Sequence, residues 1–501
     1  MIPLRVILPG LTLCLLNLLG CNNQQATAPT AARPFRGLKI KVLIPDRPEL
    51  KAWLDDQRGE WSADTGAEVE ISSYSQDELL AWPIASAANQ LTGISSPVCD
   101  VIFLASPNMG HAVLADLAAK IPNEVIDAPA YERKDISPAV LNHLVAWDRH
   151  PHAIPVSAEC MLVYYRIDLF DQEGIRKRFE EKYGHPLAAP TSWEKFDQIA
   201  EFFEGTDLNG DGSPDHALVI SSASDAIICR AATFAKTAQN YSFYFDVDTQ
   251  APLATGPVFL SAMEQWAKIA PTIANRTEPD PQLSIFTTGH AAMALGSSAL
   301  AGKLLKARAE QAENPTVGKV ACTALPGSPR VFEYDKQAWL DLPAGKLNHA
   351  SVVSGLVATV PRPSQQPHVA LDFLTFLTNR QRSLPYVTSP NYSLGPFRLS
   401  HLVDSGAWIA TGWSSKYTPG YLAAMLDSLN ETNVVTILRV AGSEEYHQSL
   451  DADVFAALRK ETTPSDALAH IAESWRSITE ARGPDRQRRQ YRYSLGMPVR
   501  N

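Results

Sequence analysis

The sequence predicts an α/β protein with a mainly parallel sheet, organised in two large lobes. Segments that read as strand, helix, strand and helix follow one another from residue 38 to about residue 120, and this order is typical of parallel sheets covered by helices. About 480 residues follow the first twenty, too many for one ordinary domain and enough for two. A hydrophobic content of 45% and a charged content of 20% indicate a substantial buried core.

Local signals mark the first elements. Alternating or continuous apolar residues predict strands at 38–44, 68–71 and 98–104. Residues 48–65 place apolar side chains on one helical face, and Gly66 is a favourable stop. A further helix is expected around residues 111–120.

Two later helices have clear start signals. Thr191 and Glu194 have the spacing of a capping box, in which the threonine hydroxyl accepts a free backbone N–H and the glutamate reaches back to another. Thr463 and Asp466 repeat this spacing, with Pro464 at the favoured first helical position. The apolar stripes behind both signals predict core packing and no binding role.

The amino terminus carries the pattern of an export signal. One early positive charge, Arg5, precedes an apolar run over residues 6–19, and Gly20 leads directly to Cys21 and a polar stretch. The run is shorter than the ~20 apolar residues that a membrane-spanning helix needs, so it predicts a cleaved signal peptide. A cysteine after Leu-Leu-Gly resembles the lipobox of bacterial lipoproteins, which implies acylation of Cys21. An ordinary secreted protein with an unmodified cysteine is the alternative.

Charge and cysteine content narrow the functional classes. The net charge of −10 argues against nucleic acid as a partner, because nucleic acid requires a basic surface. Cys14 and Cys21 belong to the amino-terminal signal. The remaining cysteines, far apart and without metal-ligand spacing, are Cys99, Cys160, Cys229 and Cys322. Their apolar neighbours favour buried free thiols over disulfides, and their spacing excludes a sequence-local zinc site.

No common catalytic motif occurs in the sequence. GxSxG, HExxH, a P-loop and GxGxxG after a strand are all missing. Acid and base carboxylates need not be close in sequence, so an enzyme such as a tethered glycosidase or esterase stays open as an alternative.

A series of short segments points to one protein family. Residues 154–170 combine a proline, a small polar turn and a Tyr-Tyr pair, and residues 286–293 have the form F..GkaAM. Further matching segments, in chain order, are 61–70, 99–102, 190–194, 324–327, 370–378, 396–400, 445–446 and 464–483. Together they resemble the extracellular solute-binding proteins of ABC sugar importers, of the maltose and multiple-sugar type, over roughly residues 38–495.

The resemblance implies a two-lobe periplasmic-binding-protein-like (type II) fold with a hinge and an interlobe cleft. It implies that the chain is a monomeric binding protein and no enzyme, and that it captures a small-molecule sugar for the transmembrane permease of an ABC importer. A lipid anchor would hold it at the cell membrane, facing the periplasm or the cell exterior. The expected segments are 1–20 (signal peptide), 21–37 (lipidated tether), 38–155 with 320–382 (lobe 1), 156–319 with 383–495 (lobe 2) and 496–501 (tail).

Ligand candidates follow from the family positions. A sugar has hydroxyl groups at its rim and apolar C–H faces, so its site needs polar side chains together with aromatic rings. The candidates carried over position by position are Ser106, Asn108, Ser157, Glu159, Ser297, Ser298, Ser354, Gly355, Tyr392 and Arg398. The aromatic candidates are Tyr74, Trp82, Trp408 and Trp413. Packing in the core or the hinge is the alternative for each aromatic residue.

Residues 207–215 have the spacing of a calcium loop. Oxygen-bearing side chains occupy loop positions 1, 3, 5, 7 and 9, namely Asp207, Asn209, Asp211, Ser213 and Asp215. Gly212 stands at the tight turn, but Leu218 replaces the bidentate glutamate at position 12. Calcium binding and a purely structural turn are therefore both open, with the turn favoured.

Two features keep other functions open. Ser297 and Ser298 stand where the family often has an aromatic residue that stacks on sugar, so a sensor or scaffold lipoprotein is a third function class. The last twenty residues are rich in arginine, which fits either a solvated tail, the favoured reading, or contact with anionic lipid.

Overall fold

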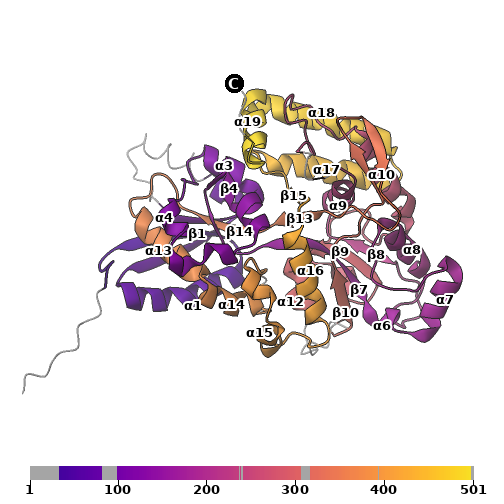
Figure 1. Ribbon diagram of the computed structural model, residues 1–501, viewed down its shortest axis with the longest axis horizontal. Helices are drawn as coiled ribbons and strands as arrows, with labels where there is room; N and C mark the ends of the chain where they lie inside the picture. Colours follow the sequence, from indigo (N-terminus) through magenta and orange to yellow (C-terminus); the bar gives the residue numbers. More distant parts are fainter. Residues whose placement is uncertain are drawn as a thin grey trace, which may run out of the picture.

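The chain forms two lobes that lie side by side, each built on its own β-sheet (Figure 1). The computed structural model describes residues 33–81, 99–235, 237, 241–305, 316, 318–392 and 394–497. None of the helices in these ranges is both long and apolar enough to cross a membrane. Cys21 and Trp82, both predicted functional residues, lie outside the described residues.

Lobe 1 is built on a five-stranded sheet with the order β2-β1-β3-β14-β6. Its strands are β1 (Lys39–Pro45), β2 (Glu68–Tyr74), β3 (Val101–Ala105), β6 (Ile154–Pro155) and β14 (Leu356–Thr359). The pairs β1–β2 and β1–β3 are parallel, whereas β14 runs antiparallel to both of its neighbours. The predicted parallel arrangement is therefore confirmed, with β14 as the exception in this sheet.

Lobe 2 is built on a six-stranded sheet in which five strands follow the order β15-β13-β7-β9-β8 and β10 also pairs with β7. Its strands are β7 (Glu159–Arg166), β8 (Leu218–Ile220), β9 (Met293–Ser297), β10 (Val320–Thr323), β13 (Ser351–Ser354) and β15 (Val434–Thr436). β7 runs antiparallel to β9, β10 and β13. Two separate hairpins are β4 (Ala146–Trp147) with β5 (His150–Pro151), and β11 (Arg330–Glu333) with β12 (Ala338–Asp341).

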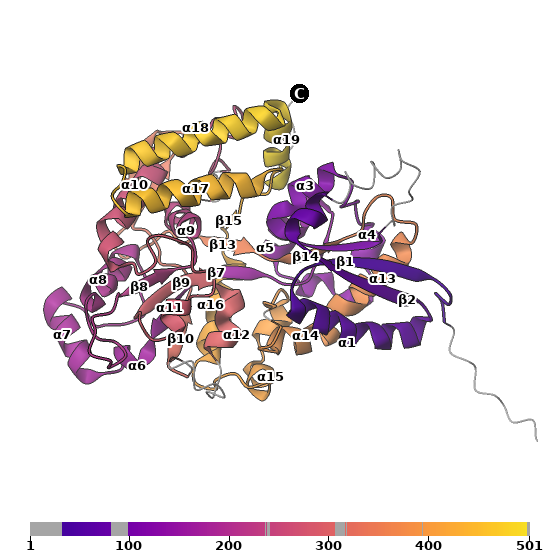
Figure 2. The same ribbon diagram turned by 180° about the vertical axis from the view of Figure 1, so that it is seen from behind.

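Helices cover both sheets (Figures 1 and 2). Helical segments of lobe 1 include α1 (Pro48–Thr65), α3 (Met109–Leu114), α4 (Asn123–Ile126), α5 (Pro138–Val140), the π-helical turn η4 (Leu141–Val145), α13 (Pro367–Thr378) and α14 (Arg380–Thr388). Those of lobe 2 are α6 (Ile167–Phe170), α7 (Glu173–Tyr183), α8 (Trp193–Phe203), α9 (Ala223–Ala235), α10 (Pro257–Ile269), α11 (Ser284–Thr287), α17 (Ser443–Leu458) and α18 (Pro464–Arg482). Between or beside the lobes lie α12 (Ala301–Leu304), α15 (Ser405–Ala410), α16 (Thr418–Asn430) and α19 (Pro484–Ser494).

The chain crosses between the two sheets at two adjacent places. Residues 156–158 connect β6 to β7, and Gly355 connects β13 to β14. The two connections are hydrogen-bonded to each other, since the N–H groups of Val156 and Ser157 both donate to the Leu356 carbonyl, over 2.9 and 3.1 Å. This pair of connections is the crossing between the lobes.

The local helix signals are largely confirmed. α1 spans Pro48–Thr65 and ends at Gly66, which has a left-handed φ of 78°. Thr463 caps α18 by accepting the N–H of Asp466 over 3.1 Å. The capping box at Thr191 is wrong by one residue, because Ser192 has the extended backbone of the cap and accepts the N–H of Lys195. α3 is shorter than predicted and ends at Leu114.

The predicted lobe boundaries are wrong after residue 320. β10 and β13, both within the segment 320–382 expected in lobe 1, pair with β7 in the sheet of lobe 2. Conversely, α14 packs on lobe 1, where the ring of Tyr386 lies 4.4 Å from that of Trp53. Strand partners are chosen by backbone pairing between distant segments, which short apolar runs in the sequence do not specify.

The four described cysteines are buried and unpaired, as predicted. They belong to the apolar cores of the two lobes.

Candidate functional site

The strand directions bring the carboxyl ends of both sheets to the crossing. β6 enters the crossing from lobe 1, and β1 to β3 run parallel to it; β13 enters from lobe 2, and β8, β9, β10 and β15 run parallel to it. In open α/β sheets, ligands bind beyond the carboxyl ends of the strands. The residues that follow these strands are therefore the candidate site.

Three predicted residues meet in a polar cluster beside the crossing. Glu159 begins β7, Ser297 ends β9 and Ser354 ends β13, opposite Glu159 in the strand register. The Ser297 hydroxyl donates to the Glu159 carboxylate over 3.1 Å. All three side chains are half-buried. We call Glu159, Ser297 and Ser354 the junction cluster.

The Glu159 carboxylate lies in a largely buried, polar environment. Burial raises its pKa, while the positive charge of Arg47 and the hydrogen bond from Ser297 oppose that rise. Arg47 follows β1 directly and is itself paired with Glu49 over 2.9 Å. A carboxylate in this setting can accept hydrogen bonds from ligand hydroxyl groups, with a cation nearby.

Other predicted residues hold the crossing together. The Ser157 hydroxyl accepts the N–H of Leu356 over 3.1 Å, and the Ser298 hydroxyl accepts the N–H of Cys160 over 3.0 Å. The Ser106 N–H donates to the Gly355 carbonyl over 2.8 Å. The hydroxyl-bearing side chains of these serines are buried, so their structural role is the positioning of backbone. Asn108 is half-buried in the 3-10 turn that follows β3.

Two glycines allow backbone segments to touch at the crossing. A Cβ atom on Gly355 would overlap the carbonyl oxygen of Ser157, and one on Gly395 would overlap the carbonyl oxygen of Ala158. The N–H of Ala158 in turn donates to the Gly395 carbonyl over 3.3 Å. Three chain segments therefore pack backbone against backbone at this point.

Sequence reasoning missed Arg47 and a second carboxylate at the same edge. Asp225 lies in the first turn of α9, directly after β8, and accepts a hydrogen bond from Ser221 over 3.0 Å. Burial raises its pKa. Their positions in the sequence offered one signal, because Arg47 follows the predicted strand β1 and Ser221 follows β8. The sequence did not show, however, which strand ends face the crossing.

Two of the three tryptophans expected to stack on ligand, Trp408 and Trp413, are buried in the core instead. Trp408 is 0% exposed and Trp413 is 3% exposed, and their ring centroids lie 4.7 Å apart. Each indole N–H donates to a backbone carbonyl, that of His401 for Trp408 and that of Thr388 for Trp413. The core alternative is thus the correct one, because both rings and both polar atoms already have protein partners.

Arg398 is also a structural residue. Its guanidinium is fully buried, donates to the carbonyls of Thr378 and Tyr131, and lies 3.6 Å from the Asp135 carboxylate. It joins segments of lobe 1, so its assignment to a ligand site is wrong. Tyr392 is half-buried and donates its hydroxyl hydrogen to Asp56 of α1 over 3.0 Å.

Carboxylate oxygens in the loop at residues 207–215 accept hydrogen bonds from the backbone of the same loop. The Asp207 carboxylate accepts the N–H groups of Gly210 and Gly212, over 2.7 and 2.9 Å. Asp215 accepts the N–H of Leu208 over 2.8 Å and pairs with His290. Within the described part of the chain, no group of three or more His, Cys, Asp or Glu residues is arranged to hold a metal ion. This geometry supports the structural-turn interpretation.

Comparison with known families agrees with this geometry. Residues 60–411 match the family model described as bacterial extracellular solute-binding protein. The chain belongs to this family. No curated protein sequence matches this solute-binding protein.

Solved structures share its fold. An ABC transporter solute-binding protein from Agrobacterium radiobacter K84, in complex with ribitol, is 16% identical with a TM-score of 0.64, covering 89% of this chain and 100% of that one. The sugar-binding protein MalE from Xanthomonas citri is 14% identical with a TM-score of 0.63, over 89% and 98% of the two chains. A maltose-bound MalE protein of T. maritima is 18% identical with a TM-score of 0.59, over 88% and 100%. The solute-binding protein described here therefore has the two-lobe fold of these sugar-binding proteins, and its family is one of exported substrate-binding proteins.

Proposed function

We propose that this solute-binding protein captures a carbohydrate or polyol between its lobes and delivers it to the permease of an ABC importer, while a lipid on Cys21 tethers it to the membrane. Family membership supports binding and export. Proteins with the same fold have been solved with ribitol, D-mannitol, maltose and D-tagatose. The shared chemistry of these ligands is a chain or ring of hydroxyl groups.

The observation that carries the proposal is the junction cluster at the meeting of the two sheets. Glu159 and Ser297 come from different strands and are already joined by a hydrogen bond of 3.1 Å. Sugar hydroxyl groups both donate and accept hydrogen bonds, so a carboxylate beside serine hydroxyls is a suitable partner. Arg47 adds a donor and a balancing charge from the lobe 1 side.

Ligand capture would use the crossing as a hinge. Two adjacent connections, 156–158 and Gly355, form the crossing between the sheets. Rotation about such a short connection closes two rigid lobes around a ligand. The ligand then favours the closed state because it contacts both lobes only in that state, and the permease would recognise the closed form.

The first test is calorimetric titration of the exported protein with ribitol, mannitol, tagatose and maltose. We expect saturable binding of one ligand class. Glu159→Gln should weaken that binding about tenfold or more, because a charge-assisted hydrogen bond contributes about 1.5–3 kcal/mol. Glu480→Gln, which alters an exposed carboxylate on α18, is the matched control and should bind normally.

Three results would redirect the proposal. Failure of every sugar and polyol to bind would favour the sensor or scaffold alternative, which Ser297 and Ser298 already suggest by standing where an aromatic residue is common. Equal affinity in the wild type and Glu159→Gln would remove the junction cluster from the site. Chemical conversion of the bound sugar, detected by NMR, would instead indicate an enzyme.

The anchor is tested with the two cysteines of the amino-terminal signal. Cys21→Ala should move the protein from the membrane fraction to the soluble exported fraction, because the acyl chain would have no attachment point. Cys14→Ala changes a cysteine in the predicted signal peptide and should leave the distribution unchanged. Retention of the Cys21→Ala protein in membranes would contradict lipidation at this residue.

A further inference from the structure

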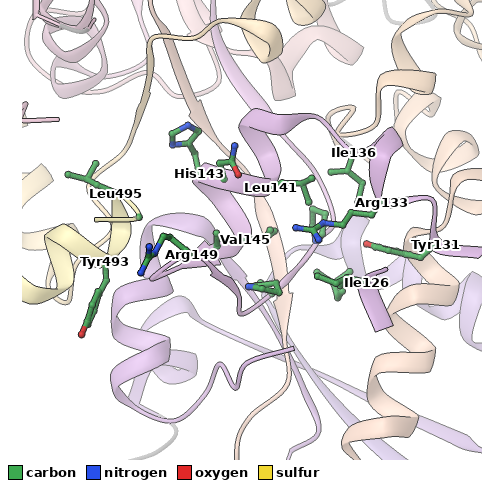
Figure 3. Close-up of a pocket in the computed structure, with 17 residues that line it drawn as sticks. Ile126, Tyr131, Arg133, Ile136, Leu141, His143, Val145, Arg149, Tyr493 and Leu495 are labelled. Atoms are coloured by element: carbon green, nitrogen blue, oxygen red, sulfur yellow. The ribbon is translucent and has the colours of Figure 1, made fainter. Parts of the chain in front are cut away.

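A cavity apart from the junction cluster lies where the end of α19 meets lobe 1 (Figure 3). Its volume is about 260 Å³. One wall comes from the stretch of lobe 1 between α4 and β6, and the other from Tyr493, Leu495 and Gly496. Glu159, Ser297 and Ser354 do not line it, so this cavity is distinct from the proposed sugar site.

Aliphatic side chains form one part of the cavity wall. The aliphatic side chains that line it are Ile126, Ile136, Leu141, Val145, Ile154 and Leu495. Ile154 and Ile136 are buried within the core of lobe 1. Such walls suit the hydrocarbon or aromatic body of a small ligand, which gains free energy by leaving water.

The charged residues of the cavity are all basic. Arg133 and Arg149 line it on two sides of Val145, as Figure 3 shows, and His143 is a further lining residue. No Asp or Glu is among the described residues that line the cavity. In a chain of net charge −10, the lining of this cavity therefore carries arginine charge and no carboxylate, which favours an anionic ligand.

The two arginines differ in their partners. Arg133 pairs with Asp127 over 2.8 Å at the surface. Arg149 has no hydrogen-bond or ion-pair partner among the described residues, and its side chain is exposed. An arginine without a carboxylate partner, beside an apolar cavity, offers its planar donor edge to an incoming anion.

The backbone fixes where the Arg149 side chain starts. Asp148 and Arg149 form the two-residue turn between β4 and β5, with left-handed φ angles of 46° and 63°. Such turns normally carry Asn or Gly, since other residues are strained there. The N–H of Asp148 donates to the Tyr493 carbonyl over 3.0 Å, so the turn is tied to the opposite wall of the cavity.

A third guanidinium adds to the positive field. Arg439 is 1% exposed and donates to the carbonyls of His143, Leu144 and Ala146, with no carboxylate among its described partners. Burial lowers its pKa to about 9, so it remains charged at neutral pH. It lines a smaller cavity that shares His143 and Leu495 with the first one.

We propose that this cavity binds a small organic carboxylate. The carboxylate group pairs with Arg149, within the positive field of Arg133 and Arg439, and the apolar body packs against Leu141, Val145 and Leu495. Because the walls come from lobe 1 and from α19, a bound carboxylate also links α19 to lobe 1.

The test uses benzoate and its uncharged analogue benzamide, which have nearly the same shape. Ligand-observed NMR titration of the exported protein, in buffer without other carboxylates, measures both dissociation constants. We expect benzoate to bind at least about tenfold more tightly than benzamide, as for one charge-assisted hydrogen bond. Ribitol or maltose should not displace benzoate, whether or not either sugar binds elsewhere.

Three variants locate the site. Arg149→Met should weaken benzoate binding about tenfold and leave benzamide unchanged, whereas Arg149→Lys, which keeps the charge without the planar fork, should lose less. Lys134→Met removes an exposed charge adjacent to Arg133 that does not line the cavity, and it should bind like the wild type. Equal benzoate binding by Arg149→Met and the wild type, or equal affinity for benzoate and benzamide, would overturn the proposal.

Discussion

The two lobes touch in two different ways. At the crossing, chain connections 156–158 and Gly355 are hydrogen-bonded to each other and packed against Gly395 without room for a side chain. At the second contact, α3 meets the segment after β15, where a Cβ on Gly110 would overlap the Arg439 carbonyl. The Arg439 guanidinium donates to carbonyls of η4 and to that of Ala146 in β4. The crossing is continuous chain, whereas the second contact is side chain and packing only.

The crossing is held by the continuous chain, whereas the second contact can separate without breaking a covalent bond. The proposed hinge motion would rotate backbone torsions at the crossing while keeping its hydrogen bonds. The same motion must separate or slide the surfaces of the second contact, since nothing covalent joins them. Mutations at the two contacts should therefore change different quantities. A mutation at the crossing should lower the free energy of global unfolding, and one at the second contact should increase local opening.

The largest expected effect is at the crossing. Gly395→Ala places a methyl group on the Ala158 carbonyl, and overpacking of this kind costs about 3 kcal/mol of unfolding free energy. Urea denaturation of the two proteins measures the loss. Gly59→Ala, in a solvent-facing part of α1 with no atom within 4 Å of the new Cβ, is the control and should gain up to about 1 kcal/mol. An unfolding free energy of Gly395→Ala equal to that of the wild type would show that the crossing tolerates expansion.

The second contact should respond to Arg439→Met. This change leaves the carbonyls of His143, Leu144 and Ala146 without their side-chain donor, which should cost about 2 kcal/mol. Hydrogen exchange should rise in α3 and η4 but not in β14. Arg362→Met, which removes a pair with Asp116 at the surface, should change stability by less than about 1 kcal/mol. Faster exchange throughout both sheets would argue against a local contact.

A pH-dependent effect provides a reference inside lobe 2, away from both contacts. His447 lies in α17, and burial lowers its pKa from 6.5 to about 4. The folded state therefore binds fewer protons than the unfolded state between these pH values, so this group's contribution to stability is lost as the pH falls through them, by at most about 3 kcal/mol. His447→Leu should remove that part of the pH dependence in denaturation at pH 7, 5.5 and 4.

Two buried carboxyl groups also make the free energy of unfolding depend on pH, in the opposite direction to His447. Burial raises the pKa of Asp225 and of Asp451, and carboxyls of this kind add stability as the pH falls, opposite to His447. Only the difference between wild type and His447→Leu isolates the histidine. An identical pH slope in the two proteins would contradict a neutral, buried ring.

Local signals predicted the parts of the fold that depend on neighbours in sequence. α1 begins at Pro48 because proline fits the first turn of a helix, and it ends at Gly66 because glycine adopts the left-handed backbone conformation there. Thr463 marks α18 for the same reason. The two-lobe fold followed from the ordered family segments, and the alternating strands and helices supported it.

Distant contacts decided the parts that could not be predicted. Trp408 and Arg398 have the residue types of a sugar site, but tertiary packing gives each of them backbone carbonyls as partners and removes them from solvent. Arg47 and Asp225 became candidates only when strand order placed their strand ends at the crossing. The sequence predicted Glu159 and Ser297 as two separate ligand candidates. Only the structure shows that they are hydrogen-bonded to each other.

The four buried thiols impose an order of events on the newly exported chain. Burial raises the pKa of Cys99, Cys160 and Cys322 to about 12, and because the thiolate is the reactive form, the folded protein resists oxidation at these positions. If the exported chain enters an oxidising compartment, the same thiols keep their ordinary acidity until the chain folds. In that case folding must precede disulfide formation, and a chain that has not yet paired β7 with β13 would be open to scrambled, cross-linked forms.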